Sequence, residues 1–416
     1  MRIELGYGKT TQTVDIPNAN YASTLELDKE TGGAVGPSLV AKALRNPIGT
    51  PILGNIVRPG EHIAIVTSDI TRPVPSRLIL PLILDELKTA GVRPGDITVV
   101  FALGSHRPHT HEEMIDLVGP EVFDAVRCVD SDPGDCIHLG QTTAGTPVTI
   151  TRVVAEADRR IAVGNIEYHY FAGYSGGAKA VMPGCSTRAA IQQNHRMMVH
   201  PEAVTGHIDN NPVRLDLEEA IALCPIDFIV NVVLGEHKEI RHAVAGHFIE
   251  AHRVGCRFLD SLYRIIIPER ADIVIASQGG APKDINLYQT QKALDNAKHA
   301  VKPGGIIILA GACGEGLGER VFEDWMMASH SPADLIERIG RDFQLGGHKA
   351  AAIAMVLREA HVYLVSDMDP DFVRRIYMEP FAHVQQALDA ALQRLGSRAT
   401  VLAMPYAGAT LPSCEG

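Results

Sequence analysis

The segment HIAIVTSDITRPVPSRLILPLILDEL, residues 62–87, decides the predicted fold. Its first six residues form an apolar run that indicates a buried strand, and the polar loop SDITRPVP separates this run from a helix expected over 76–87. Similar apolar runs at 96–103, 160–166 and 228–234 alternate with amphipathic stretches. This alternation predicts an α/β protein with largely parallel sheets.

A second series of elements begins in the last third of the chain. ADIVIAS, residues 271–277, predicts a strand, a helix is expected over 286–301, and IIILA, residues 306–310, predicts the next strand after a KPGG turn. We therefore expect two α/β domains, 1–268 and 269–416. Polar loops follow strands in both halves, and open α/β sheets bind ligands there, so we expect the active site in a cleft between the domains.

Composition indicates a folded globular protein and excludes some partners. The chain has 416 residues, of which 46% are hydrophobic, and a formal net charge of -11, which argues against a general nucleic-acid binder because phosphate binding needs a basic face. No segment is apolar for ~18 residues, so we expect no membrane span and a cytoplasmic location. The seven cysteines include no CxxC pair, which predicts reduced thiols.

A glycine-rich segment follows the third predicted strand and contains YSGGAKA, residues 174–180. Ser175, Gly176 and Gly177 allow the backbone to approach a ligand closely, and their N–H groups suit a phosphate. The spacing is not that of a Walker loop. Lys179 is a candidate phosphate contact, Schiff-base amine or attachment point, and the alternative is a solvated lysine in the first turn of a helix.

Three histidines lie in or beside polar loops. His106 belongs to GSHRPH, His169 lies ten residues before Lys179, and His195 lies sixteen residues after it. Histidine acts as a base near neutral pH and is a good nickel ligand. A single histidine is more often an ordinary surface or core residue. Three further histidines are assigned no role in the site: His109, His111 and His200.

Two groups of polar side chains suit a carboxylate substrate. The guanidinium of Arg72, in the SDITRPVPS loop, matches a carboxylate, although an ion pair with Asp69 that holds the loop is the alternative. In NLYQTQKAL, spacings of three and four place Tyr288, Gln289 and Lys292 on one helical face. Without further information, ordinary amphipathic polarity is the favoured explanation of that second pattern.

Taken together, these motifs resemble the nickel-dependent lactate racemase family. The resemblance runs through most of the chain and rests on ELGYGK, TRPVPS, GSHR, HYFAGYSGGAKAVMPG, NHRMM, NNPVR and LYQTQKALDNA. The order and spacing of these motifs are more specific than any one of them. Ala178 is a departure, because some relatives carry arginine there, and we expect it to affect the surroundings of the loop and not the chemistry.

The resemblance implies a definite chemistry. A lysine matching Lys179 carries a pyridinium-3-thioamide-5-thiocarboxylic acid mononucleotide, the nickel-pincer nucleotide, and a histidine matching His195 completes the coordination of nickel. Histidines matching His106 and His169 form the acid/base pair. The other implied residues are Arg72, Tyr288, Gln289 and Lys292 at the substrate and Asp69, Thr71, Ser175, Gly176 and Gly177 at the cofactor.

The chemistry of a 2-hydroxy acid agrees with these roles. Its α-hydrogen is barely acidic, so removal as hydride to the cofactor avoids a carbanion, while a histidine takes the hydroxyl proton. Return of hydride to the opposite face inverts C2. We therefore expect a racemase or epimerase of a lactate-like, malate-like or sugar acid, with cofactor-biosynthesis proteins as partners.

Two alternatives stay open. A nicotinamide-dependent 2-hydroxyacid dehydrogenase would need a GxGxxG motif after a strand, and this motif is absent. A non-catalytic protein that only carries the cofactor would need neither His106 nor His169.

Overall fold

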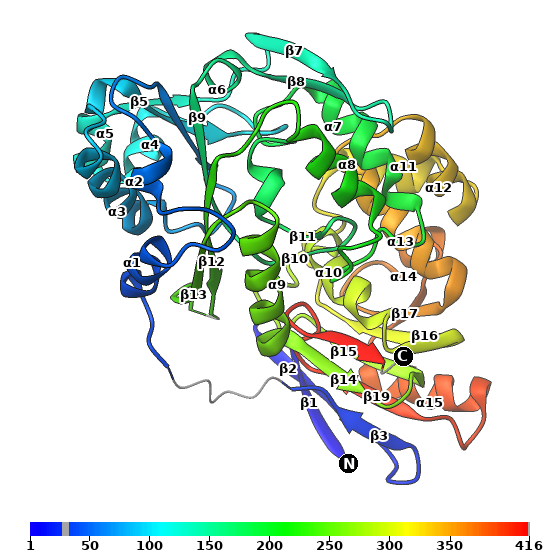
Figure 1. Cartoon of the computed structure of the whole chain (residues 1–416). Helices are drawn as coiled ribbons and strands as arrows, with labels where there is room; N and C mark the ends of the chain where they lie inside the picture. The colour runs from blue at the N-terminus through cyan, green and yellow to red at the C-terminus, as the bar shows by residue number, and fades with distance from the viewer. Residues whose placement is uncertain (27–32, 236, 415–416) are drawn as a thin grey trace. The chain divides into compact units, whose positions relative to one another are not determined.

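The chain divides into two compact units. The structure, a computed structural model, describes residues 1–26, 33–235 and 237–414. Unit 1 comprises Met1–Glu30 and Leu262–Gly416, and unit 2 comprises Thr31–Ser261 (Figure 1). Both units have the mixed α/β architecture with largely parallel sheets that the alternating pattern predicts.

Unit 2 is built on a six-stranded sheet of order β13-β12-β9-β4-β5-β6. Only β12 and β13 pair antiparallel, and the other neighbours are parallel. The central strands are buried almost throughout, as expected for parallel strands covered on both faces. The strands are β4 (Ile63–Ser68), β5 (Ile97–Ala102), β6 (Arg127–Asp130), β9 (Arg159–Asn165), β12 (Phe228–Leu234) and β13 (Ile240–Gly246).

Helices and two small hairpins complete unit 2. The apolar face of α3 packs Ile79, Ile83 and Leu87 into the core against the sheet. The helices are α1 (Pro37–Arg45), α2 (Leu53–Ile56), α3 (Ser76–Thr89), α4 (His111–Val118), α5 (Pro120–Ala125), α6 (Arg152–Ala155), α7 (Arg188–His195), α8 (Pro212–Ala220) and α9 (Glu250–Tyr263). Three 3-10 turns are η1 (Pro94–Asp96), η2 (Gly177–Ala180) and η3 (Arg196–Val199). The hairpins are β7 (Cys136–Gln141) with β8 (Pro147–Thr151) and β10 (Tyr168–His169) with β11 (Gly173–Tyr174).

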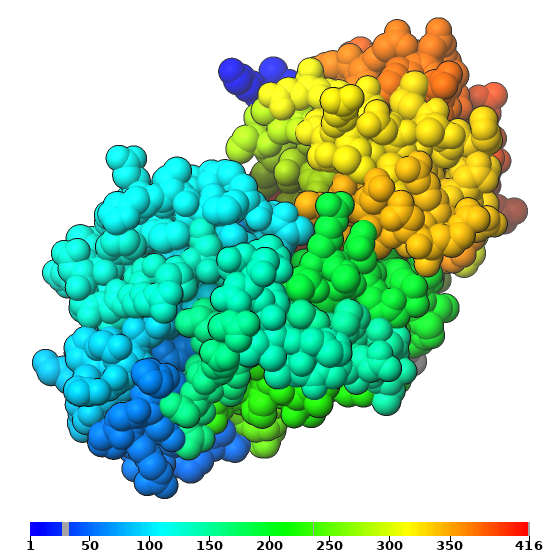
Figure 2. All heavy atoms as spheres, turned by 90° about the horizontal axis from the view of Figure 1, so that it is seen from above, coloured from blue at the N-terminus to red at the C-terminus, as the bar shows by residue number. Residues whose placement is uncertain are grey.

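Unit 1 contains a second six-stranded sheet, of order β18-β17-β16-β15-β19-β3, in which every pair is parallel. Its strands are β3 (Tyr21–Thr24), β15 (Ala271–Ser277), β16 (Val301–Ala310), β17 (His361–Val365), β18 (Glu379–Phe381) and β19 (Val401–Met404), and a short pair joins β14 (Arg264–Ile267) to β20 (Leu411–Cys414). Its helices are α10 (Leu287–Ala297), α11 (Arg320–Ala328), α12 (Pro332–Arg341), α13 (Gly347–Glu359), α14 (Pro370–Arg375) and α15 (Val384–Leu395). In the space-filling view, the residues around α11 to α13 form a continuous yellow-to-orange surface (Figure 2).

The first residues of the chain belong to unit 1, which differs from the expected division into 1–268 and 269–416. The hairpin of β1 (Arg2–Tyr7) and β2 (Thr10–Asp15) buries apolar side chains in the same core as β15 and β16. Ser277 also donates from Oγ to the carbonyl of Gly6, at 2.7 Å. Further on, β3 becomes the edge strand beside β19. These pairings join segments far apart in the sequence, so local patterns do not reveal them.

Most predicted elements lie where the sequence places them. The strand at 271–277 coincides with β15, whereas the helix expected over 286–301 ends at Ala297. The KPGG turn lies within β16, where the register shifts so that Ala271 pairs with Val301 but Ile273 pairs with Ile306. All seven cysteines are unpaired, as predicted. No helix in the described part of the chain is both long and apolar enough to span a membrane.

Candidate active site

His106 and Asp69 form a pair at the carboxyl ends of β4 and β5. Nδ1 of His106 lies 2.7 Å from Oδ2 of Asp69, and Thr71 donates from Oγ1 to the other carboxylate oxygen at 2.9 Å. Burial alone would raise the pKa of Asp69, but the hydrogen bonds from His106 and Thr71 hold it below its usual range. With Nδ1–H of His106 donated to this carboxylate, the lone pair of the neutral ring is on Nε2.

Arg72 is linked to the glycine-rich segment and not to Asp69. Its Nη1 lies 3.4 Å from Oε1 of Glu167, and both side chains are partly exposed. The backbone of Glu167 in turn exchanges hydrogen bonds with Ser175, through the Ser175 N–H and the Ser175 hydroxyl. The alternative in which Arg72 pairs with Asp69 is therefore not observed, and the guanidinium reaches the segment that carries Lys179.

Phe171 is the centre around which three sequence-predicted residues gather. The ring of His169 lies 4.5 Å from the Phe171 ring, the ring of His195 lies 4.8 Å from it, and Nζ of Lys179 lies 5.9 Å from its centroid. Phe171 itself is buried. No local pattern distinguished this phenylalanine, because an aromatic residue beside glycines is usually an ordinary core residue.

Two ionisable groups beside Phe171, the side chains of His169 and Lys179, are held toward their uncharged forms. Burial, with smaller contributions from Lys179 and Arg72, lowers the pKa of His169 well below its usual value. Burial, followed by the charges of Arg214 and Arg72, does the same to the pKa of Lys179. Nδ1 of His169 accepts the N–H of Ala172 at 3.2 Å, so the proton of the neutral ring is on Nε2. The neutral His106 and His169 rings are thus opposite tautomers.

A chain of hydrogen bonds orients His195. Asn194 is fully buried and donates from Nδ2 to the Val213 carbonyl and to the carboxylate of Asp216, so its Oδ1 is an acceptor. That oxygen lies 2.8 Å from Nδ1 of His195, which therefore donates. The resulting tautomer has its lone pair on Nε2, the atom that a metal would use. Thr146 donates to the same Asp216 carboxylate and keeps the chain in place.

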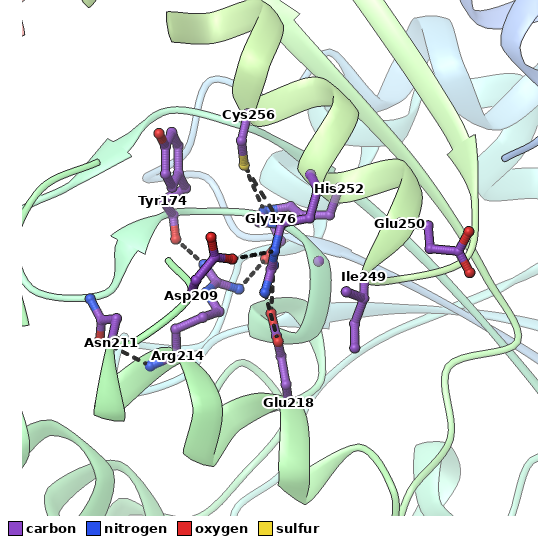
Figure 3. A network of polar contacts seen from close by, with 12 residues as sticks. Tyr174, Gly176, Asp209, Asn211, Arg214, Glu218, Ile249, Glu250, His252 and Cys256 are labelled. Carbon is purple, nitrogen blue, oxygen red and sulfur yellow. Dashed lines mark hydrogen bonds and ion pairs between the residues drawn. The ribbon is translucent and has the colours of Figure 1, made fainter. Parts of the chain in front are cut away.

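Arg214 supports the glycine-rich segment from α8, as Figure 3 shows. Its guanidinium is fully buried and donates to the backbone carbonyls of Ala172, Tyr174 and Gly176. The ring of His252, on α9, lies 2.7 Å through Nε2 from the carbonyl of Ser175. Burial lowers the pKa of Arg214 to about 10. Four backbone carbonyls of this segment, at residues 172 and 174–176, are therefore in contact with the buried side chains of Arg214 and His252.

The glycines of the segment are required by close approach. A Cβ on Gly173, whose φ is +75°, would lie 2.0 Å from the carbonyl oxygen of His207.

The predicted phosphate cradle, made from the N–H groups of residues 175–177, has two of its three donors engaged within the chain. The N–H of Ser175 bonds to Glu167, and that of Gly177 bonds to Oδ1 of Asn231.

In unit 1, two of the three predicted substrate residues share a cavity of about 230 Å³. Gln289 and Lys292 line it together with Gln278, Lys283 and Tyr406. Tyr288 is not among the residues that line this cavity. The Tyr288 ring packs instead against Phe322 and His348, at 5.9 and 6.5 Å, and burial raises its pKa.

His109, which the sequence interpretation set aside, is engaged in the same loop region as His106. Its side chain is 1% exposed, and Nδ1 lies 2.6 Å from Oδ1 of Asp130. Nε2 accepts the backbone N–H of Ile70 at 3.0 Å. The sequence signal for His109 was its position three residues beyond the candidate base His106. That position does not distinguish a functional residue from one without a role in the site.

Two family models match most of the chain. Residues 7–206 match the family model for the lactate racemase N-terminal domain, and residues 266–410 match the model for the lactate racemase C-terminal domain. A lactate racemase of Lactiplantibacillus plantarum is 35% identical over 97% of both chains. One from Thermoanaerobacterium thermosaccharolyticum is 36% identical over 94% of both chains.

The chain belongs to the lactate racemase family. It is accordingly an isomerase, a racemase. The structure of the lactate racemase apoprotein from T. thermosaccharolyticum superposes with a TM-score of 0.88 at 32% identity, over 99% of this chain and 100% of that one. A Thermotoga maritima protein, at 17% identity and a TM-score of 0.62, over 91% of this chain and 98% of that one, shares the fold alone.

Proposed function

We propose that the chain racemises a small 2-hydroxy acid at C2, with lactate as the first candidate. Lactate is the substrate in the names of both relatives that align over nearly the whole chain. The observation that carries the proposal is the gathering of His169, His195 and Lys179 around Phe171. A tethering amine, a metal ligand and an acid/base group are then within one small region.

Lys179 and His195 fit a lysine-tethered nickel-pincer nucleotide. The lowered pKa of Lys179 makes its amine available for amide-type attachment near neutral pH. The Asn194 contact gives His195 the Nε2 lone pair that nickel requires. Within the described residues no group of three or more His, Cys, Asp or Glu side chains gathers for a metal. A single protein ligand is enough when the cofactor supplies the remaining donors.

When bound, the group supplies an acceptor for the hydride of the substrate. The chain's own residues then move the hydroxyl proton. Nε2 of His106 accepts it from one enantiomer, and the Asp69 carboxylate stabilises the imidazolium that forms. His169 serves the other enantiomer. In its neutral ring Nδ1 accepts the Ala172 N–H and Nε2 carries the proton, so the ring must release that N–H and move its proton to Nδ1 before Nε2 can take the hydroxyl proton.

Arg72 is proposed to anchor the substrate carboxylate. Its present partner, Glu167, is partly exposed and 3.4 Å away, so a substrate carboxylate can compete for the guanidinium. Gln289 and Lys292 are proposed as further substrate contacts, because they line a cavity that contains two lysine side chains. Asp69, Thr71 and residues 175–177 are proposed to lie beside the cofactor.

The test is co-expression with cofactor-making proteins, followed by intact mass, nickel content and racemisation of a panel of chiral 2-hydroxy acids. We expect a mass increase on the Lys179 peptide, bound nickel and loss of optical rotation. Lys179→Ala should prevent attachment, and His195→Ala should lower nickel content while leaving attachment intact. No mass increase and no nickel would overturn the cofactor assignment.

The acid/base pair has its own test. His106→Ala and His169→Ala should each reduce racemisation by at least about 10²-fold, because a positioned acid/base group contributes that much or more. Cofactor attachment should be unchanged in both variants. Near-normal rates in both would refute the two-histidine mechanism. An α-deuterium isotope effect on the wild-type rate checks that the C–H bond is broken.

A further inference from the structure

His109 joins the ends of three neighbouring strands. It lies in the loop after β5, Asp130 is the last residue of β6, and Ile70 follows β4. Asp130 accepts both Nδ1–H and the backbone N–H of His109, at 2.6 and 2.8 Å. The Ile70 N–H completes the link through Nε2 at 3.0 Å. Asp130, His109 and Ile70 thus form a continuous hydrogen-bonded bridge across the strand ends.

The bridge requires one tautomer of His109. A backbone N–H can only donate, so Nε2 must carry the lone pair and Nδ1 must carry the proton. The Asp130 carboxylate accepts that proton, which makes the assignment consistent at both ends. The Phe101 ring, whose centroid is 5.2 Å away, packs against the imidazole, and the side chain is nearly inaccessible. Because it is held on several sides, the ring orients the Ile70 amide.

The residues on either side of Ile70 belong to, or support, the groups proposed to bind and activate the substrate. Asp69, immediately before it, holds His106, and Thr71, immediately after it, hydrogen-bonds Asp69. The N–H of Arg72 closes the turn on the Asp69 carbonyl at 3.1 Å. A shift of the Ile70 peptide therefore moves the Asp69 carboxylate and Arg72 together.

We propose that His109 is a positioning residue for racemisation, in which its unprotonated Nε2 holds the 69–72 turn so that Asp69 meets His106 and Arg72 meets the substrate. This inference rests on the proposed roles of His106 and Arg72. The two Asp–His pairs of this region then have separate tasks. The Asp69–His106 pair transfers a proton, and the Asp130–His109 pair keeps Asp69 in position beside His106.

Two substitutions separate positioning from simple packing. His109→Asn keeps a polar group at the reach of Nδ1 but offers no acceptor where Nε2 stood. His109→Gln extends an amide oxygen to that position and can accept the Ile70 N–H. A misplacement of about 1 Å costs on the order of 10²-fold in rate. We therefore expect His109→Asn to lower kcat about 10- to 100-fold and His109→Gln to return it to within about threefold of wild type.

The matched control is His111→Asn, at an exposed histidine two residues further on whose ring packs against Phe123. Its kcat should equal that of the wild type. Holoenzyme variants are compared at equal cofactor content, checked by intact mass, and equal urea midpoints exclude a general folding defect. The KM for the substrate should rise in His109→Asn because Arg72 is displaced.

A second readout does not depend on turnover. In the protein purified without cofactor, nitrogen-15 imidazole spectra should show His109 with a protonated Nδ1 and an unprotonated Nε2. Exchange of the Ile70 amide should quicken at least about tenfold in His109→Asn and recover in His109→Gln. Wild-type exchange and kcat in His109→Asn would overturn the positioning role while the proposed function stands. A loaded wild-type enzyme that racemises no 2-hydroxy acid would instead overturn the proposed function and the role derived from it.

Discussion

Replacement of Arg214 by methionine gives the strongest test of how the glycine-rich segment is held. The change removes the donors to three buried carbonyls, those of Ala172, Tyr174 and Gly176. The carbonyls of Ala172 and Gly176 also accept the backbone N–H groups of Tyr174 and Lys179. A hydrogen bond from a charged donor contributes roughly 1.5–3 kcal/mol, so the loss of all three costs about 6 kcal/mol. The buried guanidinium carries its own penalty, because its pKa falls from 12.5 to about 10, equivalent to about 3 kcal/mol. The expected net destabilisation is about 3 kcal/mol.

The assay is equilibrium urea unfolding followed by pulsed hydrogen exchange and mass spectrometry of peptides from residues 171–182. These peptides report unit 2 separately from unit 1. Arg214→Lys should lie between wild type and Arg214→Met, because an ammonium presents its charge at one point and lacks the guanidinium fork. The matched control is Arg257→Met, which removes an exposed arginine from α9 and should change the free energy of unfolding by less than about 0.5 kcal/mol. A loss below about 1 kcal/mol in Arg214→Met would refute the reasoning, because the carbonyls would then be satisfied without the guanidinium.

Three further predictions concern other parts of the chain. Burial lowers the pKa of His348 from its ordinary value of 6.5 to about 3. Between pH 6.5 and about pH 3 the unfolded chain therefore binds a proton at His348 that the folded chain does not bind, and stability falls as the pH falls through that window. His348→Asn, which keeps an acceptor for the Gly346 N–H, should flatten this dependence by up to about 1.4 kcal/mol per pH unit, and parallel curves for unit 1 peptides from pH 7 to 4 would contradict it. Gly173→Ala should be at least about 2 kcal/mol less stable than Gly60→Ala, because both have positive φ but only Gly173 would clash; equal urea midpoints would count against the clash. Competitive acetylation of the cofactor-free chain should give Lys179 a titration midpoint well below 10.5, and a midpoint at that value would show that its amine is not held uncharged.

The strands and helices were predictable where the pattern is local. ADIVIAS is apolar at five of its seven positions and is bounded by polar residues, so its strand is predicted with both ends in place. The placement of residues 1–26 was not predictable, because it depends on pairing with strands that lie hundreds of residues away. Tyr21 pairs with Val401, and nothing in the hydrophobic pattern of β3 names that partner. The expected boundary at 268 assumed that each domain is one continuous stretch of chain, whereas compact units follow tertiary contacts.

The candidate site was predictable for residues that belong to recognisable motifs, and less so for those that support them. Asp69, Thr71 and His106 were named from the sequence and lie within hydrogen-bonding distance of one another. In the sequence, Arg214 stood out only as the last residue of the NNPVR motif. A buried arginine that bonds three carbonyls of a distant loop gives no local signal, because its acceptors are backbone atoms that every residue has.

His106 and His109 show where sequence reasoning stops. They stand three residues apart in one loop, and each has an aspartate at Nδ1. What separates them is the second nitrogen and its surroundings. The His106 side chain is 36% exposed, whereas that of His109 is 1% exposed and its Nε2 is occupied by the Ile70 amide. A base needs an accessible lone pair, and a support needs a buried one. The same Asp–His pair therefore serves either task, and only the tertiary structure decides which.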